Sequence, residues 1–173
     1  MRTALVIIDV QQGMFTFSTP LYRGAETVER IAQLLQRARA GRVPIFHIQH
    51  DGGPGHGLAR GSSGWPHHPA VTPKAGEAVI EKRHSSAFQT TDLHSRLQQA
   101  GVERLVVAGV QTEMCVESAC RAAAALGYRV VLAADAHTTF DNPVLSAAQI
   151  IAHHNHTLGN GFAELVPAEQ IDF

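Results

Sequence analysis

Three residues in separate parts of this 173-residue sequence have side chains that could catalyse a reaction together: Asp9, Lys82 and Cys115. A thiol becomes a nucleophile when a neighbouring base takes its proton or a neighbouring cation stabilises its thiolate. Each residue also has an ordinary structural interpretation. Asp9 could turn the chain after a strand, Lys82 could be a solvated charge, and Cys115 could be a buried structural cysteine. The chemistry therefore depends on whether the fold brings the three together.

Short apolar runs alternate with segments whose apolar residues recur at helical spacing. The predicted strands span residues 3–9, 43–48, 78–81, 104–110, 129–134 and 163–166. The predicted helices span residues 25–40, 91–99, 112–126 and 143–158. Strands alternating with helices favour a parallel sheet covered on both faces. We expect a single Rossmann-like three-layer α/β domain over residues 1–173, with a six-stranded parallel sheet in the order 3-2-1-4-5-6.

This topology brings the three residues to one edge of the sheet. Asp9 closes the first strand, Lys82 follows the third, and Cys115 lies in the first turn of the helix after the fourth. Ligands of such sheets bind beyond the carboxyl ends of the strands, where the strand order reverses. Near a helix N-terminus we also expect the pKa of the Cys115 thiol to fall, and free N–H groups to receive an oxyanion.

Four segments of the sequence resemble the isochorismatase-like cysteine hydrolases. They are residues 5–11 with Phe15, residues 79–82 followed by Ser85, Ala87 and Phe88, residues 109–116, and residues 127–136. The resemblance implies a catalytic triad of Asp9, Lys82 and Cys115. It also implies a cis peptide bond between Val110 and Gln111, and an oxyanion hole formed by the backbone N–H groups of Gln111 and Cys115.

The presence of Cys115 favours one reaction of this family over another. The isochorismatases proper cleave a vinyl ether and typically lack the cysteine, so we expect hydrolysis of a C–N bond in a small-molecule amide, ureide or carbamoyl compound through a thioester. Two alternatives within the family stay open, a vinyl-ether hydrolase and a catalytically idle binding protein. A nucleotide- or flavin-binding module is disfavoured, because the glycine-rich run 52–57 follows the second strand instead of the first.

We predict no cofactor and no metal. Nicotinamidases of this family bind a metal through an Asp-x-His pattern after the second strand, whereas Asp51 is followed here by Gly52 and Gly53. Further histidines lie nearby in the sequence, but their spacing fits no strong metal-binding motif. These histidines are His50, His56, His67 and His68.

Four residues are candidates for the wall of the substrate pocket. Phe15, Phe88 and Gln111 flank members of the triad, and Trp65 lies in the long aperiodic loop 51–76, a kind of segment that is usually functional or mobile. Phe15 and Phe88 fit packing in the core equally well. An indole at position 65 could cover a planar substrate or contact a neighbouring subunit.

Composition gives expectations about partners and location. The formal net charge is −1, which provides no electrostatic case for nucleic acid or membrane binding. No apolar run approaches the roughly 18 residues that suggest a membrane span. Only two cysteines are present, Cys115 and Cys120, which fits a reducing compartment. We expect a cytoplasmic protein with a small-molecule substrate and, from the family resemblance, a homo-oligomer of two or more subunits.

Overall fold

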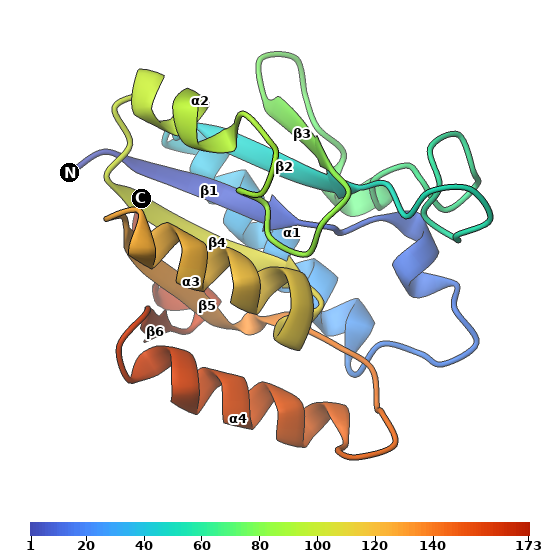
Figure 1. The fold of residues 1–173 in the computed structure, drawn as a ribbon. Coiled ribbons are helices and arrows are strands. Elements are labelled where there is room, and N and C mark those ends of the chain that lie inside the picture. Colours follow the sequence, from blue (N-terminus) through green and yellow to red (C-terminus); the bar gives the residue numbers. More distant parts are fainter.

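The computed structural model describes residues 1–173 and is built around one parallel sheet (Figure 1). The strands are β1 (Thr3–Ile8), β2 (Ile45–His50), β3 (Ala78–Lys82), β4 (Arg104–Val110), β5 (Arg129–Thr138) and β6 (Glu164–Val166). Their order is β3-β2-β1-β4-β5-β6, and every neighbouring pair is parallel. The predicted fold class and strand order are confirmed.

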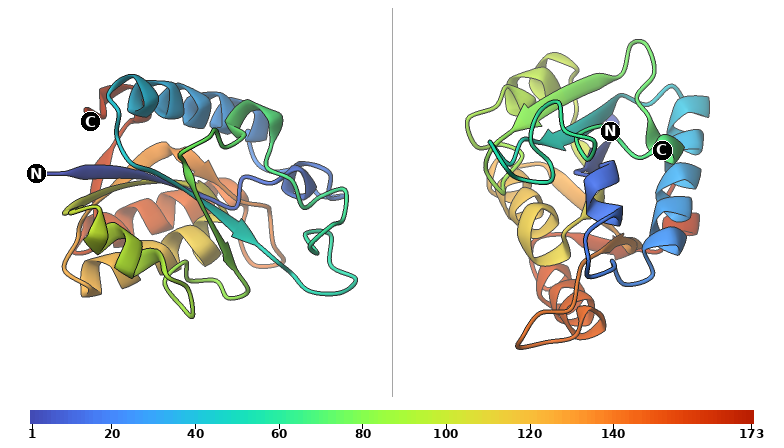
Figure 2. Two further views of the ribbon diagram at one scale, coloured as in Figure 1. Left: turned by 90° about the horizontal axis from the view of Figure 1, so that it is seen from above. Right: turned by 90° about the vertical axis from the view of Figure 1, so that its right-hand side faces the viewer.

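Helices cover both faces of the sheet, which gives three layers (Figure 2). Helix α1 (Gly24–Ala40) lies on one face, whereas α2 (Leu93–Gln99), α3 (Glu117–Ala125) and α4 (Ala147–Gly159) lie on the other. Two groups of buried apolar side chains, one on each side of the sheet, form the core. All six residues of β1 are buried, because this central strand has a covered layer on each face.

Two element boundaries differ from the sequence-based prediction. Helix α4 begins at Ala147 instead of Pro143, because Ser146 caps it: the Ser146 hydroxyl accepts from the N–H of Gln149, whose side chain accepts from the N–H of Ser146. The segment predicted as one helix over 112–126 has two parts, a π-helical turn over Thr112–Val116 and then α3. Such π-helical turns are frequent at functional sites.

The long loop 51–76 is fastened to the chain that follows β1. The N–H of Gln12 donates to the carbonyl of Pro66 at 2.8 Å, and the N–H of His68 donates to the carbonyl of Val10 at 2.8 Å. The buried Gln11 side chain adds a bond from Nε2 to the Trp65 carbonyl at 3.0 Å. These bonds hold the loop at the carboxyl edge of the sheet, on the right of Figure 1.

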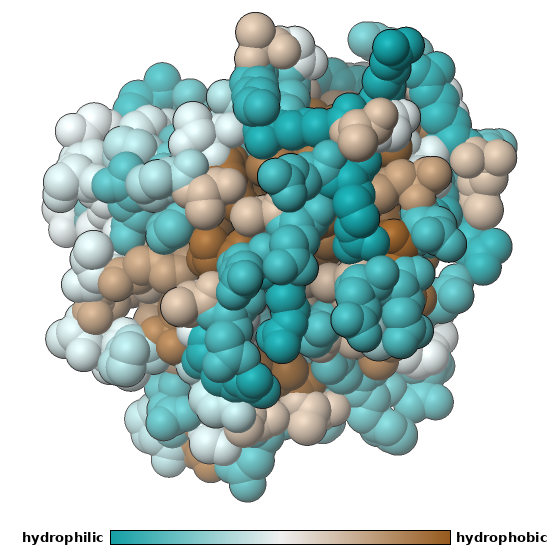
Figure 3. Space-filling model, turned by 180° about the vertical axis from the view of Figure 1, so that it is seen from behind, coloured by the Kyte–Doolittle hydropathy of each residue, from teal (hydrophilic) through white to brown (hydrophobic).

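No helix is long and apolar enough to cross a membrane. The face of the molecule shown in Figure 3 is covered mainly by hydrophilic side chains, with hydrophobic atoms visible between them.

Candidate active site

Asp9 is the first residue after β1, and its carboxylate is buried with an exposure of only 2%. Its backbone has a φ of 50°, an uncommon conformation for a residue other than glycine. Oxygen Oδ2 accepts a hydrogen bond from Lys82 Nζ at 2.7 Å, whereas Oδ1 is buried without a hydrogen-bond partner. Burial raises the pKa of Asp9, and the charge of Lys82 opposes that rise. The free oxygen is therefore well suited to accept a proton.

Lys82 ends β3 and connects the other two members of the predicted triad. Its ammonium nitrogen lies 2.7 Å from Asp9 Oδ2 and 3.2 Å from Cys115 Sγ. It also donates to the His84 carbonyl at 3.1 Å and contacts His50 Nδ1 at 3.3 Å. Four neighbours thus fix the Lys82 side chain, which is fully buried. The structure brings Asp9, Lys82 and Cys115 together.

Cys115 lies in the π-helical turn after β4, and the pKa of its thiol does not fall as we expected. Burial raises that pKa to about 12, the negative charge of Asp9 adds to the rise, and Lys82 opposes it. The expectation considered only the favourable position near a helix start, and it neglected the cost of a thiolate in a site shielded from water. The thiol therefore holds its proton until a base takes it, and Asp9 is adjacent.

The backbone is unusual at two places where β4 ends. The peptide bond between Val110 and Gln111 is cis, and Gly109 has a φ of 140°. A Cβ atom at position 109 would lie 2.2 Å from the carbonyl oxygen of Ile8, so glycine is required where β4 passes β1. The carbonyl of Gln111 accepts from the N–H groups of Met114 at 3.2 Å and Val116 at 3.1 Å, which closes the turn.

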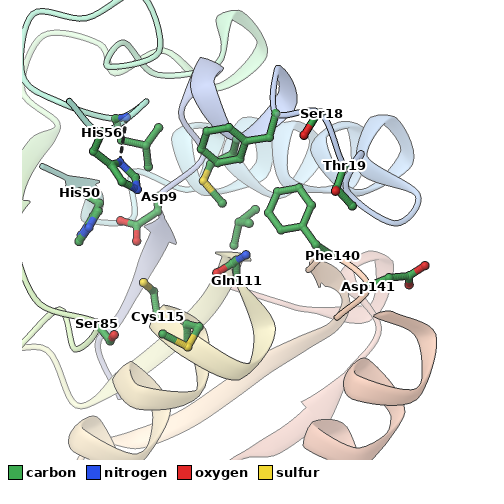
Figure 4. Close-up of a pocket in the computed structure, with 15 residues that line it drawn as sticks. Asp9, Ser18, Thr19, His50, His56, Ser85, Gln111, Cys115, Phe140 and Asp141 are labelled. Atoms are coloured by element: carbon green, nitrogen blue, oxygen red, sulfur yellow. Dashed lines mark hydrogen bonds between the residues drawn. The ribbon is translucent and has the colours of Figure 1, made fainter. Parts of the chain in front are cut away.

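A cavity of about 460 Å³ opens in front of Asp9 and Cys115 (Figure 4). Its apolar wall consists of Met14, Phe17, Leu58, Val110, Met114 and Phe140. Polar side chains line the rest, namely Ser18, Thr19, His50, His56, Ser85, Gln111 and Asp141. In Figure 4, Asp9 and Cys115 lie next to each other at one end of the cavity, with His50 and His56 beside Asp9, whereas Phe140 lies at the other end. The cavity is large enough for a small molecule.

Of the four predicted pocket residues, only Gln111 lines this cavity. Phe15 packs against the core on the side of α1, with its ring 4.7 Å from that of His68. Phe88 packs on the other side of the sheet and stacks on Tyr128. Trp65 holds the loop through its carbonyl, and the guanidinium of Arg60 lies 5.7 Å from its ring. These three predictions are wrong because sequence position does not reveal which way a side chain points.

Two histidines at the cavity were not predicted as pocket residues. Nδ1 of His50 lies 3.3 Å from the Lys82 ammonium, which has no lone pair, and the N–H of Leu58 donates to Nδ1 of His56 at 3.0 Å. Since each Nδ1 faces a group that cannot accept a hydrogen bond, a neutral ring carries its hydrogen on Nε2. The His56 ring occupies the space beside Gly52, where a Cβ atom would lie 2.1 Å from Nδ1. The consecutive glycines after β2 were the available signal for this close approach.

The carboxylate of Asp51, the first residue of the incomplete Asp-x-His pattern, already has partners. Its Oδ1 accepts from the N–H groups of Gly53 and Arg60, and its Oδ2 lies 2.9 Å from an Arg83 nitrogen. These bonds lower the pKa of Asp51. No group of three or more His, Cys, Asp or Glu side chains in the structure is arranged to hold a metal ion.

Comparison with known proteins agrees with this fold. Residues 3–163 match the family model of the isochorismatase domain. The chain belongs to the isochorismatase family. The resemblance inferred from the sequence is thereby confirmed.

Three relatives of this isochorismatase-family chain illustrate its similarity to known proteins. A streptothricin hydrolase of Streptomyces noursei is 40% identical over 140 residues, which cover 81% of this chain and 51% of that protein. A maleamate amidohydrolase of Pseudomonas putida is 30% identical, with 76% of this chain and 70% of that protein covered. A crystal structure of an isochorismatase from Pseudomonas putida superposes with a TM-score of 0.95 at 33% identity, covering 99% of this chain and 90% of the other. The chain spans about half the length of the streptothricin hydrolases it matches.

Proposed function

We propose that this chain is a cysteine-dependent hydrolase that cleaves a C–N bond of a small-molecule amide, ureide or carbamoyl compound. The observation that carries the proposal is the position of Lys82 Nζ, 2.7 Å from Asp9 Oδ2 and 3.2 Å from Cys115 Sγ, beside a cavity of about 460 Å³. A nucleophile, a base and an orienting charge within contact distance are the parts that acyl transfer requires. The amide-cleaving relative named above supports the same reaction class.

In the first half of the proposed reaction, Asp9 takes the thiol proton and the sulfur of Cys115 attacks the substrate carbonyl carbon. The oxyanion that forms is held by the backbone N–H groups of Gln111 and Cys115. As the intermediate collapses, the C–N bond breaks and the proton on Asp9 passes to the leaving nitrogen, which departs as ammonia or an amine. The product left on the enzyme is a thioester.

In the second half, Asp9 removes a proton from water while the oxygen attacks the thioester carbonyl. The C–S bond then breaks, the acid product leaves, and the proton returns from Asp9 to sulfur. Lys82 stays protonated throughout and compensates the negative charge that moves between carboxylate and sulfur. This cycle uses no metal, and its proton transfers balance with Asp9 as the only acid and base.

The proposal is tested by an ammonia-release screen over small amides and ureides, with Cys115→Ala as the inactive variant. We expect Cys115→Ala to abolish release, because the sulfur that attacks the substrate carbonyl is then missing. Cys120 provides the matched control: it is fully buried in the core and burial raises its pKa to about 12, so Cys120→Ala should retain most of the activity. Equal loss in both variants would contradict the assignment of the nucleophile.

Mass spectrometry of the quenched protein distinguishes this reaction from vinyl-ether cleavage. Amide hydrolysis through a thioester leaves an acyl group on the Cys115 peptide, and treatment with hydroxylamine removes it. A turnover that never yields such an adduct would favour the vinyl-ether reaction instead. Failure of Cys115 to react with iodoacetamide, with no amide hydrolysed, would favour a catalytically idle binding protein.

A further inference from the structure

A chain of three polar side chains, two of them buried and one half-buried, lies behind the turn that carries Cys115, and no step of the proposed reaction uses it. Oγ1 of Thr112, the first residue of the turn, lies 2.8 Å from His137 Nδ1. Nε2 of His137, in β5, lies 2.9 Å from Oδ1 of Asn155, in α4. Thr112 is fully buried, and only 2% of the surface of His137 is exposed. None of the three side chains lines the cavity.

The direction of every hydrogen bond in this chain is determined. The carbonyl of Ala134 can only accept, so the amide nitrogen of Asn155 donates to it at 3.0 Å. Oδ1 of Asn155 must therefore accept from Nε2–H of His137. Burial lowers the pKa of His137 to about 4, so the neutral ring has a lone pair on Nδ1. The hydroxyl of Thr112 can then only donate to that lone pair.

A second contact holds the next residue of the turn from the same strand. The hydroxyl of Thr139, directly after β5, donates to Glu113 Oε1 at 2.8 Å. His137 and Thr139 are two residues apart and fasten two consecutive residues of the turn, Thr112 and Glu113. The backbone at the start of the turn is therefore held by side chains that do not contact the cavity.

We propose that Thr112, His137 and Asn155 are positioning residues that hold the oxyanion-binding N–H groups of Gln111 and Cys115 in place. This inference rests on the proposed function. Thr112 directly follows Gln111 and precedes Cys115 by three residues, so its side chain anchors the backbone between the two donors. Stabilisation of an oxyanion depends steeply on where the donors lie, and a displacement of about 1 Å can cost about 100-fold in rate.

Two reactions of the Cys115 thiol distinguish a displaced oxyanion hole from a general loosening of the site. Acylation by 4-nitrophenyl acetate forms a C–S bond, passes through an oxyanion and expels 4-nitrophenolate, whereas alkylation by iodoacetamide displaces iodide without any oxyanion. We expect Thr112→Val, which has nearly the same shape but no hydroxyl, to slow acylation of Cys115 by roughly 10- to 100-fold. The alkylation rate should change less than about threefold. Both rates are measured with Cys120→Ala as the background, so that only one thiol reacts.

Conservative and matched variants complete the experiment. Thr112→Ser retains the hydroxyl that donates to His137, so its Cys115 should be acylated at close to the rate of the parent protein. Asn155→Leu should slow acylation as much as Thr112→Val does. Thr27→Val is the control, because Thr27 is also buried, with an exposure of 4%, but its hydroxyl donates to the carbonyl of Arg23, the residue that precedes α1. Cys115 of the Thr27→Val variant should be acylated at the rate of the parent protein.

The remaining outcomes distinguish failure of the positioning role from failure of the proposed function. Acylation of Thr112→Val at the parental rate, an equal slowing of both reactions, or a serine variant as slow as the valine variant would each overturn the positioning role alone. A parent protein that forms no acyl adduct on Cys115 would overturn the proposed function and this inference with it.

Discussion

At the level of single residues, Asp9 has two effects on Cys115 that one substitution can separate. Its negative charge raises the pKa of the thiol, and its free oxygen can accept the thiol proton and later protonate the leaving nitrogen. We expect Asp9→Asn to lower the pKa of Cys115, because Lys82 would then act on the sulfur without an opposing carboxylate. Hydrolysis should nevertheless fall at least about 100-fold, because the general acid is gone.

The measurement for Asp9→Asn is the pH profile of iodoacetamide alkylation beside the rate of amide hydrolysis. The alkylation profile of the variant should shift to lower pH than that of the parent protein, while turnover is nearly lost. A profile that shifts to higher pH would mean that Asp9 does not repel the thiolate. Unchanged hydrolysis would show that Asp9 is not the acid and base of the reaction.

The sequence predicted some residues of the site better than others for physical reasons. Asp9, Lys82 and Cys115 lie at or just beyond the ends of strands that meet at one edge of a parallel sheet, so topology alone brings them near one another. The aromatic wall was predicted wrongly, because flanking a catalytic residue does not decide which face a side chain occupies. Phe17 and Phe140 line the cavity, and each comes from a loop whose path depends on tertiary contacts.

At the level of elements, the absence of a side chain at Gly109 allows β4 to lie close to β1 beside the site. It has a φ of 140°, and a Cβ atom there would lie 2.2 Å from the carbonyl oxygen and 2.7 Å from the nitrogen of Ile8. We expect Gly109→Ala to lower the free energy of unfolding by about 3 kcal/mol or more, since backbone strain and overpacking act together. Urea unfolding measures this change.

Gly127 is a matched control for this substitution. It also has a positive φ, 89°, but no atom lies within 4 Å of a Cβ placed there. Gly127→Ala should therefore cost only the conformational strain, about 1–2 kcal/mol. Equal costs for the two variants would show that contact with Ile8 does not make position 109 special.

The elements were predictable where periodicity and stop signals agree, as in α1, which begins within one residue of the predicted start and ends before Gly41. The start of α4 was predicted four residues early, because the apolar spacing continues upstream of the capping box formed by Ser146 and Gln149. The π-helical turn over 112–116 was not predictable, because its hydrogen bonds depend on the turn formed at Gln111. Local patterns thus predict an element more reliably than its ends.

At the level of the whole molecule, the fold buries His137 and half-buries His67, and the sequence indicated neither environment. Burial lowers the pKa of His137 to about 4, and burial together with His47 lowers the pKa of His67 to about 4. The ordinary value for histidine is 6.5. Both residues come from segments that look unremarkable in sequence, and only the packing of β5 against α4 and of the long loop against β2 removes them from water.

The lowered pKa values of these two histidines predict loss of stability in mild acid. As the pH falls below 6.5, the unfolded chain binds a proton at His137 while the folded protein resists protonation until about pH 4, so the equilibrium moves toward unfolding. The contribution of His137 is fully present above pH 6.5 and is lost progressively down to pH 4. Between pH 7 and pH 5 the free energy of unfolding should fall by about 2 kcal/mol from this residue. His67 acts in the same direction.

Urea unfolding at pH 7 and pH 5 measures this loss, and His137→Gln identifies its source. Glutamine does not titrate, so the variant, although less stable at pH 7, should lose about 2 kcal/mol less than the parent protein between the two pH values. Glu77 does not interfere, because its bonds to Arg39 and His47 and to the N–H of Lys74 overcome burial and lower its pKa to about 2. Its contribution is present above pH 4.5 and disappears only toward pH 2. The same pH dependence in His137→Gln as in the parent protein would mean that His137 is protonated equally in both states.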